Sequence, residues 1–167
     1  LSILKKMGGK IKIKKTKARS GEKRGTVEVL SSSLKGISIP AKLSPFLIDE
    51  YPILSIAASR AKGITYMKGL NELRHKESDR IKSIVGMLKS FGIKAKSIKN
   101  DIKIYGSSSK EVMCNKTIKV NSDHRIALSA SILGIISNNS VKLDDNGKSM
   151  ATSYPNFKDD LKKLIIN

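Results

Sequence analysis

Apolar positions along the chain show one clear helical pattern, which follows position 80. They recur at spacings of three and four residues and so share one helix face: Ile81, Ile84, Val85, Leu88 and Phe91. Gly92 comes directly after the last of them and is a typical helix end signal. The pattern therefore predicts a helix that begins at about Ile81 and ends before Gly92.

Shorter apolar runs predict the other elements. Segments rich in Ala, Ser and Ile at about 51–60 and 123–136 are typical of helices buried against a sheet, and another helix is expected at 157–166. Alternating or short apolar segments predict strands at 10–15, 26–30, 37–39, 64–67, 94–98, 102–105, 117–120 and 140–143, with a tight turn at 99–101. Helices and strands alternate with short connections, so the predicted fold class is α/β or α+β.

Two pairs of segments repeat along the chain in the same order. A helix end, Leu-Lys-Lys-Met-Gly from Leu4, returns as Leu-Lys-Ser-Phe-Gly from Leu88, and an extended segment follows each copy. Asp49 and Asp123 each precede one of the apolar helices. These separations indicate duplicated units of roughly 75–85 residues, longer than most solenoid repeats. We expect units at roughly 1–87 and 88–160, with a closing helix at 157–167.

The stretch just before the helix at Ile81 is dense in charge. Residues 73–81 read Leu-Arg-His-Lys-Glu-Ser-Asp-Arg-Ile. Oxygens at a helix start accept from unpaired amides and suit the helix dipole, which accounts for Glu77, Ser78 and Asp79. Cations are disfavoured there unless an anion offsets them, and the same stretch carries Arg74, Lys76 and Arg80. It therefore predicts a site for a phosphate or carboxylate, with a solvated charge cluster as the alternative.

The overall charge favours a small anionic substrate over nucleic acid. The 167 residues carry a net charge of +19, from 27 Lys and 6 Arg against 14 acidic residues. Such a surplus can indicate binding to nucleic acid or to an anionic surface. Here the lysines are dispersed from Lys5 to Lys163 with almost no aromatic residues between them. A basic nucleic-acid-binding or RNA-end-processing module of similar repeat architecture is the alternative.

The cysteine content indicates a reducing compartment. Cys114 is the single cysteine, which excludes an internal disulfide, and two histidines beside it are too few for a Cys/His metal cluster. We find no apolar run of membrane-spanning length and no signal peptide, and we expect a cytoplasmic location. The sequence begins at Leu1 rather than at a methionine, and we interpret it as a fragment.

Four ordered motifs resemble the C-terminal part of the 5-enolpyruvylshikimate-3-phosphate synthase family. They are Ile-Asp-Glu-Tyr-Pro at 48–52, the charged stretch at 73–81, Asp-His-Arg-Ile-Ala at 123–127 and Thr-Ser-Tyr-Pro-Asn-Phe at 152–157. The resemblance implies the two-lobed enolpyruvyl transferase fold, in which each lobe is built from βαβαββ units. Residues 1–167 would then be a single C-terminal lobe fragment, with the N-terminal lobe absent. Thr152 departs from the family pattern, because many members carry Lys there.

The resemblance implies a reaction of the shikimate pathway, which serves aromatic amino acid biosynthesis. The family transfers the enolpyruvyl group of phosphoenolpyruvate to the 5-hydroxyl of shikimate 3-phosphate and releases phosphate, without a metal or organic cofactor. Such chemistry needs a base, an acid and cations that hold the substrate anions. The partners would be these two substrates and the missing lobe, with no membrane or nucleic acid, in a protein that is monomeric when complete. We expect the fragment to be inactive alone.

The resemblance also implies which residues contact shikimate 3-phosphate. Asp49 would lie near the 5-hydroxyl as the candidate catalytic base, and Lys76 would contact the same substrate and shuttle the proton. Glu77 would be a further catalytic proton-transfer residue. Glu72 occupies a shikimate-side position that is Asn in some members and acidic in others.

Two arginines would hold phosphoenolpyruvate. By the resemblance these are Arg80 and Arg125, and planar bidentate donors suit its carboxylate and phosphate. Two aspartates also have a structural interpretation. Asp49 could simply cap the helix that follows it, and we interpret Asp123, in the equivalent place, as a cap.

Overall fold

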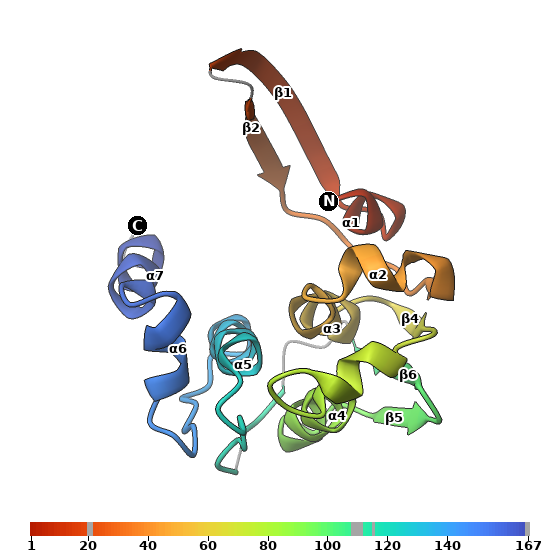
Figure 1. Ribbon diagram of the computed structural model, residues 1–167, viewed down its shortest axis with the longest axis vertical. Helices are drawn as coiled ribbons and strands as arrows, with labels where there is room; N and C mark the ends of the chain where they lie inside the picture. The colour runs from red at the N-terminus through yellow and green to blue at the C-terminus, as the bar shows by residue number, and fades with distance from the viewer. Residues whose placement is uncertain (20–21, 108–111, 115, 166–167) are drawn as a thin grey trace.

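The chain folds into a mixed α/β structure, as predicted. The computed structural model describes residues 1–19, 22–107, 112–114 and 116–165. A sheet with helices on one face forms the body, and a long hairpin projects from it (Figure 1). Among the described residues, no helix is long and apolar enough to cross a membrane.

The central sheet has four strands: β3 (Ser38–Ile39), β4 (Gly63–Met67), β5 (Ala95–Ile98) and β6 (Asp101–Gly106). Their order across the sheet is β3-β4-β6-β5. β3 and β4 run parallel, whereas β6 pairs antiparallel with both of its neighbours. Lys99 has a φ of 52° and turns the chain between β5 and β6. The four strands and the turn confirm the prediction for this region.

Two helices cover one face of this sheet: α3 (Tyr51–Ser59) and α4 (Arg80–Ser90). Met67 and Ile102 on the strands and Ile84 and Leu88 on α4 are fully buried in one continuous core. α4 follows the predicted pattern and begins one residue before Ile81. Its amphipathic face is therefore the side that meets the sheet.

A third long helix, α5 (His124–Ile136), packs against α3 and α4. It is followed by α6 (Lys148–Ser153), which packs against α5, and by α7 (Phe157–Ile165). The predicted helices at 123–136 and 157–166 are confirmed over the described residues, and position 166 lies outside them. α5 packs against helices on several sides, and its small and apolar residues occur all around it.

The predicted strands at 117–120 and 140–143 are wrong in extent. A single parallel bridge between Ile118 and Leu143 is what joins these segments among the described residues. The backbone N–H of Val120 donates to the side chain of Asp144 (3.0 Å) and so is not available to another strand. A longer pair of strands would need a backbone carbonyl to accept from this N–H, but the Asp144 carboxylate accepts from it instead.

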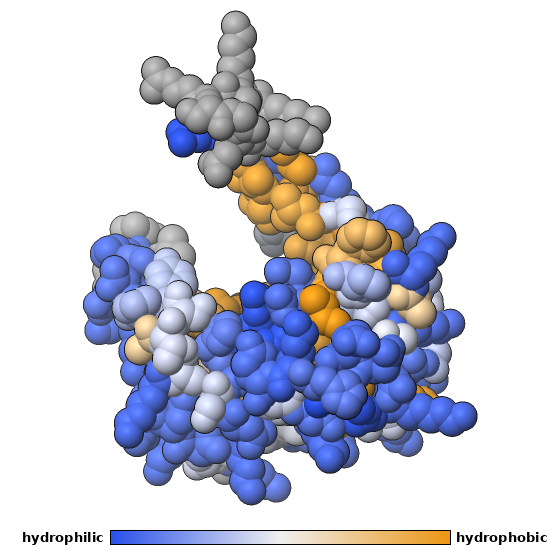
Figure 2. All heavy atoms as spheres, in the orientation of Figure 1, coloured by the Kyte–Doolittle hydropathy of each residue, from blue (hydrophilic) through white to orange (hydrophobic). Residues whose placement is uncertain are grey.

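The projecting hairpin consists of β1 (Lys10–Arg19) and β2 (Glu22–Leu30), with α1 (Ser2–Lys6) at its base. The predicted strands at 10–15 and 26–30 are confirmed and are longer than expected. Ile11 pairs with Val29 and Ile13 with Val27, so apolar side chains share one face of the hairpin. Ile13, Val27 and Val29 are exposed, and Figure 2 shows this apolar surface where the hairpin joins the body.

The sheet joins strands from both sides of position 87. β3, α3, β4, α4, β5 and β6 follow one another as β-α-β-α-β-β, and their strands share one sheet. The predicted division into units 1–87 and 88–160, with a closing helix at 157–167, stays a prediction. Three short helices complete the described structure: η1 (Ala41–Leu43), α2 (Ser44–Leu47) and η2 (Asn71–His75).

Candidate active site

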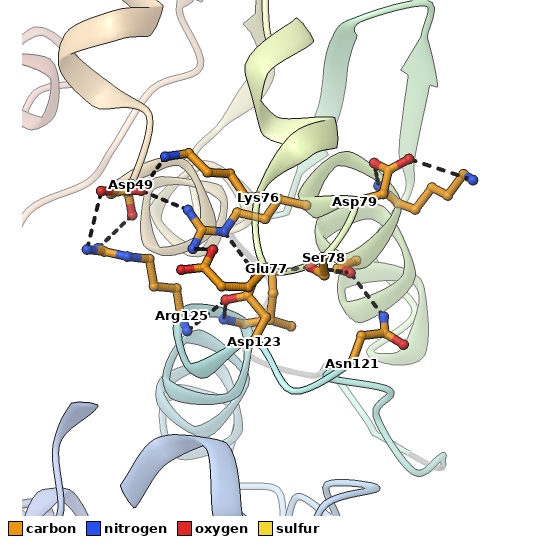
Figure 3. Close-up of polar contacts among 12 residues, drawn as sticks. Asp49, Lys76, Glu77, Ser78, Asp79, Asn121, Asp123 and Arg125 are labelled. Atoms are coloured by element: carbon orange, nitrogen blue, oxygen red, sulfur yellow. Dashed lines mark hydrogen bonds and ion pairs between the residues drawn. The ribbon is translucent and has the colours of Figure 1, made fainter. Parts of the chain in front are cut away.

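The starts of α3, α4 and α5 meet at one place on the surface (Figure 3). Asp79 caps α4 by accepting from Lys82 N (3.1 Å), and Asp123 caps α5 by accepting from Arg125 N (3.0 Å). The cap position of α3 belongs to Glu50, and no side chain caps that helix. Asp49 is therefore not a helix cap, whereas the interpretation of Asp123 as a cap is confirmed.

Arg80 is completely buried. It lies at the centre of a charged cluster, which consists of Arg80 itself, Asp49, Lys76, Glu77, Asp123 and Arg125. Its Nε donates to Asp123 Oδ2 (2.9 Å) and its Nη1 to Asp49 Oδ1 (2.8 Å), while Nη2 donates to Glu77 Oε2. Burial alone would lower the pKa of Arg80, but its hydrogen bonds to Asp123 and Asp49 outweigh this effect and raise the pKa above its ordinary value. The guanidinium is thus permanently charged and joins segments that are distant in sequence.

Of the three carboxylates that contact Arg80, Asp123 is the one that is fully buried. Besides capping α5 through Oδ1, it accepts from Arg80 Nε and from Ser78 Oγ (2.9 Å) through Oδ2. Buried carboxylates are stable when they are paired and hydrogen-bonded in this way. Asp123 therefore fixes the start of α5 against the start of α4.

Asp49 is surrounded by cations and remains partly open to solvent. Its Oδ1 lies 3.7 Å from Lys76 Nζ, in addition to the bond from Arg80, and its Oδ2 lies 3.5 Å from Arg125 Nη2. Partial burial raises the pKa of Asp49, but the hydrogen bond from Arg80 and the charges of Arg125 and Lys76 bring it below its ordinary value. The site therefore holds an ionised carboxylate beside two accessible cations.

We expect the charge of Asp49 to contribute to stability in a defined pH range. Because its folded-state pKa lies below the ordinary 3.8, this contribution is present above pH 3.8 and is lost as the pH falls through the lower, folded-state value. The free energy of unfolding should therefore fall more steeply below pH 3.8 in the unmodified protein than in Asp49→Asn. Urea unfolding at a series of pH values measures both slopes. Asp159→Asn is the control on an exposed side chain, and parallel curves for Asp49→Asn and the unmodified protein would contradict the assignment.

The structure brings five of the six predicted site residues together: Asp49, Lys76, Glu77, Arg80 and Arg125. Glu72 is exposed on η2 and accepts a hydrogen bond from Asn71 Nδ2 (3.1 Å), and no contact among the described residues joins it to the cluster. Thr152 lies on α6, where its hydroxyl donates to the carbonyl of Ser149 (2.7 Å).

Sequence reasoning missed the second role of Asp123 and the polar chain behind it. Ser78 Oγ accepts from Ser83 Oγ (3.1 Å), which in turn accepts from Asn121 Nδ2 (3.2 Å). The sequence contained a usable signal, because Asp49 and Asp123 each come shortly before an apolar helix. Nothing local in the sequence marked Ser83 or Asn121.

A pocket of about 240 Å³ opens beside Asp49 and Arg125. It lies between α3 and α5, and its other walls include Ile53, Leu128 and Phe157. Arg125 in the wall of the pocket, and Lys76 beside Asp49, can attract an anion, and Asp49 can accept a proton or a hydrogen bond. The arrangement therefore suits acid–base chemistry on a small anionic substrate.

The described residues contain no group of three or more His, Cys, Asp or Glu side chains that could hold a metal ion. The three carboxylates of the cluster instead share Arg80. The expectation that neither a metal nor an organic cofactor is used stays a prediction.

Comparisons with known proteins place nearly the whole chain in one family. Residues 1–161 match the model of the family described as EPSP synthase (3-phosphoshikimate 1-carboxyvinyltransferase). The chain is 42% identical over 164 residues to the 3-phosphoshikimate 1-carboxyvinyltransferase of Petrotoga mobilis, which covers 98% of this chain and 37% of that protein. It is 43% identical over 165 residues to the 3-phosphoshikimate 1-carboxyvinyltransferase of Clostridium tetani, and this match covers 95% of this chain and 37% of that protein.

A solved structure shows the same fold. EPSP synthase from Acinetobacter baumannii superimposes with a TM-score of 0.86 at 35% identity, over 95% of this chain and 36% of that one. The chain thus spans little more than a third of the length of the relatives that it matches. The family match and the shared fold together establish that this chain belongs to the EPSP synthase (3-phosphoshikimate 1-carboxyvinyltransferase) family.

Proposed function

We propose that this chain is the C-terminal portion of an enzyme that transfers the enolpyruvyl group of phosphoenolpyruvate to the 5-hydroxyl of shikimate 3-phosphate and releases phosphate. The observation that carries the proposal is the ionised Asp49 between Arg80, Arg125 and Lys76 in a chain of this family. Nothing in the comparisons supports the nucleic-acid alternative.

In the proposed mechanism, Asp49 is the base that takes the proton of the 5-hydroxyl, and Lys76 holds the same substrate and shuttles this proton. The freed oxygen attacks C2 of phosphoenolpyruvate while an acid, for which we propose Glu77, protonates the methylene carbon. The Glu77 carboxylate, which has given up its proton, then takes a proton from the new methyl group, the C–O bond to phosphate breaks, and the double bond is regenerated. Asp49 can accept this proton because it is ionised, and Lys76 Nζ, 3.7 Å from Asp49 Oδ1, is close enough to pass the proton on.

Arg125 is the arginine best placed to hold phosphoenolpyruvate. About a third of its side chain is exposed, and its Nη1 donates to the backbone carbonyl of Asp49 (3.0 Å). That bond orients the guanidinium toward the rim of the pocket. The direct contact that the resemblance implies for Arg80 stays a prediction, because an anion can reach this buried guanidinium only by replacing Asp49 or Glu77. The shikimate-side role of Glu72 is likewise proposed from the resemblance.

The complete enzyme would need the part of the family's length that this chain does not span. We propose that the missing N-terminal lobe closes the site and supplies further anion-binding groups, that the complete protein is monomeric and cytoplasmic, and that this chain is inactive alone. A two-lobed arrangement agrees with the exposure of Asp49, Lys76 and Arg125 on one surface.

The test is phosphate release from shikimate 3-phosphate and phosphoenolpyruvate. The protein is this chain joined behind the upstream portion of the Petrotoga mobilis relative, hereafter the fusion protein. We expect release that requires both substrates and is absent when the upstream portion is assayed alone. A folded fusion protein that releases no phosphate would overturn the proposal, and tight nucleic-acid binding that weakens steeply with salt would then support the alternative.

A further inference from the structure

A chain of hydrogen bonds runs from a surface pocket to the buried centre of the site. It begins at Asn121, beside a pocket of about 310 Å³ whose walls also include Ser83 and Lys119. Asn121 Nδ2 donates to Ser83 Oγ (3.2 Å), Ser83 Oγ to Ser78 Oγ (3.1 Å), and Ser78 Oγ to Asp123 Oδ2 (2.9 Å). Figure 3 shows Asn121 directed toward this chain from the loop before α5.

The direction of donation in this chain is set by its two ends. An amide nitrogen can only donate and an ionised carboxylate can only accept, so each serine hydroxyl accepts from one side and donates to the other. All donors therefore point toward Asp123. Hydrogen bonds aligned in this manner polarise one another and strengthen the last bond, which here is the bond to the carboxylate that also accepts from Arg80 Nε.

The backbone places Asn121 at the cost of strain. Asn121 and Ser122 have φ values of 52° and 58°, so two successive residues with side chains lie in the left-handed region. Asparagine tolerates this region better than most residues, but two such residues in succession are costly. The turn presents the amide of Asn121 and the carboxylate of Asp123 to the start of α4.

We propose that Asn121 is a positioning residue that acts through Ser83 and Ser78 on the buried pair of Asp123 and Arg80. The orientation of the Asp123 carboxylate sets the position of Arg80 Nε, and the rigid guanidinium then places Nη1 2.8 Å from Asp49 Oδ1. Loss of the Asn121 donor loosens this chain and weakens the last contact. The activity part of the test rests on the proposed function.

The test variant is Asn121→Gly in the fusion protein. Glycine adopts the positive φ of position 121 without strain, so the change removes the amide and keeps the turn. The matched control is Asn138→Gly, because Asn138 is also exposed and has a φ of 51° at the end of α5. We expect kcat/KM for phosphoenolpyruvate to fall about three- to tenfold in Asn121→Gly, the net effect of one hydrogen bond, and to stay unchanged in the control.

The pH profile separates positioning from a merely structural role. A weaker bond from Arg80 lets the pKa of Asp49 rise, so the acid limb of kcat/KM should move to higher pH in Asn121→Gly. If Asn121 only supported the local structure, its loss would lower kcat/KM at every pH and leave the pH of the acid limb unchanged. Ser83→Ala breaks the same chain at its middle. The double variant should therefore be no slower than Ser83→Ala alone, because the two changes are coupled.

A second readout does not depend on catalysis. The Nε–H signal of Arg80 is identified by NMR as the one that is lost in Arg80→Lys, and its hydrogen exchange should be faster in Asn121→Gly than in Asn138→Gly. Faster exchange in a fusion protein that releases no phosphate would support the positioning role and overturn the proposed function. An unshifted acid limb together with unchanged exchange, in an active fusion protein, would overturn the positioning role alone.

Discussion

Replacing Arg80 with methionine is expected to lower the free energy of unfolding by about 3–5 kcal/mol, the typical cost of removing one partner of a buried ion pair. Asp123, which is fully buried, would lose the cation that pairs with it. Asp49 and Glu77 would lose the donor that they share. Equilibrium urea unfolding of the fusion protein, followed by circular dichroism, measures the change.

Two further variants show whether charge is the cause. Arg80→Met combined with Asp123→Asn removes both buried charges and should recover part of the loss, while the asparagine oxygen can still cap α5. Arg80→Lys keeps the charge, but one ammonium group cannot reproduce the planar fork that contacts three carboxylates. The free energy of unfolding of Arg80→Lys should therefore lie between that of Arg80→Met and that of the unmodified protein. A loss below about 1 kcal/mol in Arg80→Met would match an exposed ion pair and contradict the burial described for Arg80.

Replacing Arg125 with alanine is expected to lower kcat/KM for phosphoenolpyruvate by about 10²- to 10³-fold, the usual effect of losing one preorganised donor to a developing anion. The Arg125 guanidinium is partly exposed at the rim of the pocket and is held there by the backbone carbonyl of Asp49. Stability should change much less than in the Arg80 variants, because no buried charge is left behind. Steady-state phosphate release by the fusion protein at varied phosphoenolpyruvate measures the effect.

The matched comparison is with other cations. Arg125→Lys keeps the charge and loses the bidentate geometry, so we expect an intermediate loss. Lys162→Ala removes a cation that is exposed on α7 and should leave the rate unchanged. If Arg125→Ala released phosphate within about twofold of the unmodified rate, Arg125 would not be a substrate-binding residue.

Local signals in the sequence predicted most of the elements. The spacing from Ile81 to Phe91 predicted α4 to within one residue, because a helix with 3.6 residues per turn needs an apolar residue every three or four positions on its buried face. Asp123 could be interpreted as a cap for a similar reason, since a cap bonds to amides that follow it directly. The strands that fell short, at 117–120 and 140–143, depend on partners that local pattern does not specify.

The sequence by itself determined the starts of α3, α4, α5 and α7, the alternation of helices and strands, and the motifs by which Asp49, Lys76 and Arg125 could be proposed as a site. The tertiary structure decided which side chains meet. It buried Arg80 among carboxylates from three segments, one of them 43 positions away, and it left Glu72 apart from them. It also brought Asn121, Ser83, Ser78 and Asp123 together in one chain of hydrogen bonds. The physical reason is that helix periodicity and capping act over a few residues of one segment, whereas burial and ion pairing depend on where the other segments of the chain pack.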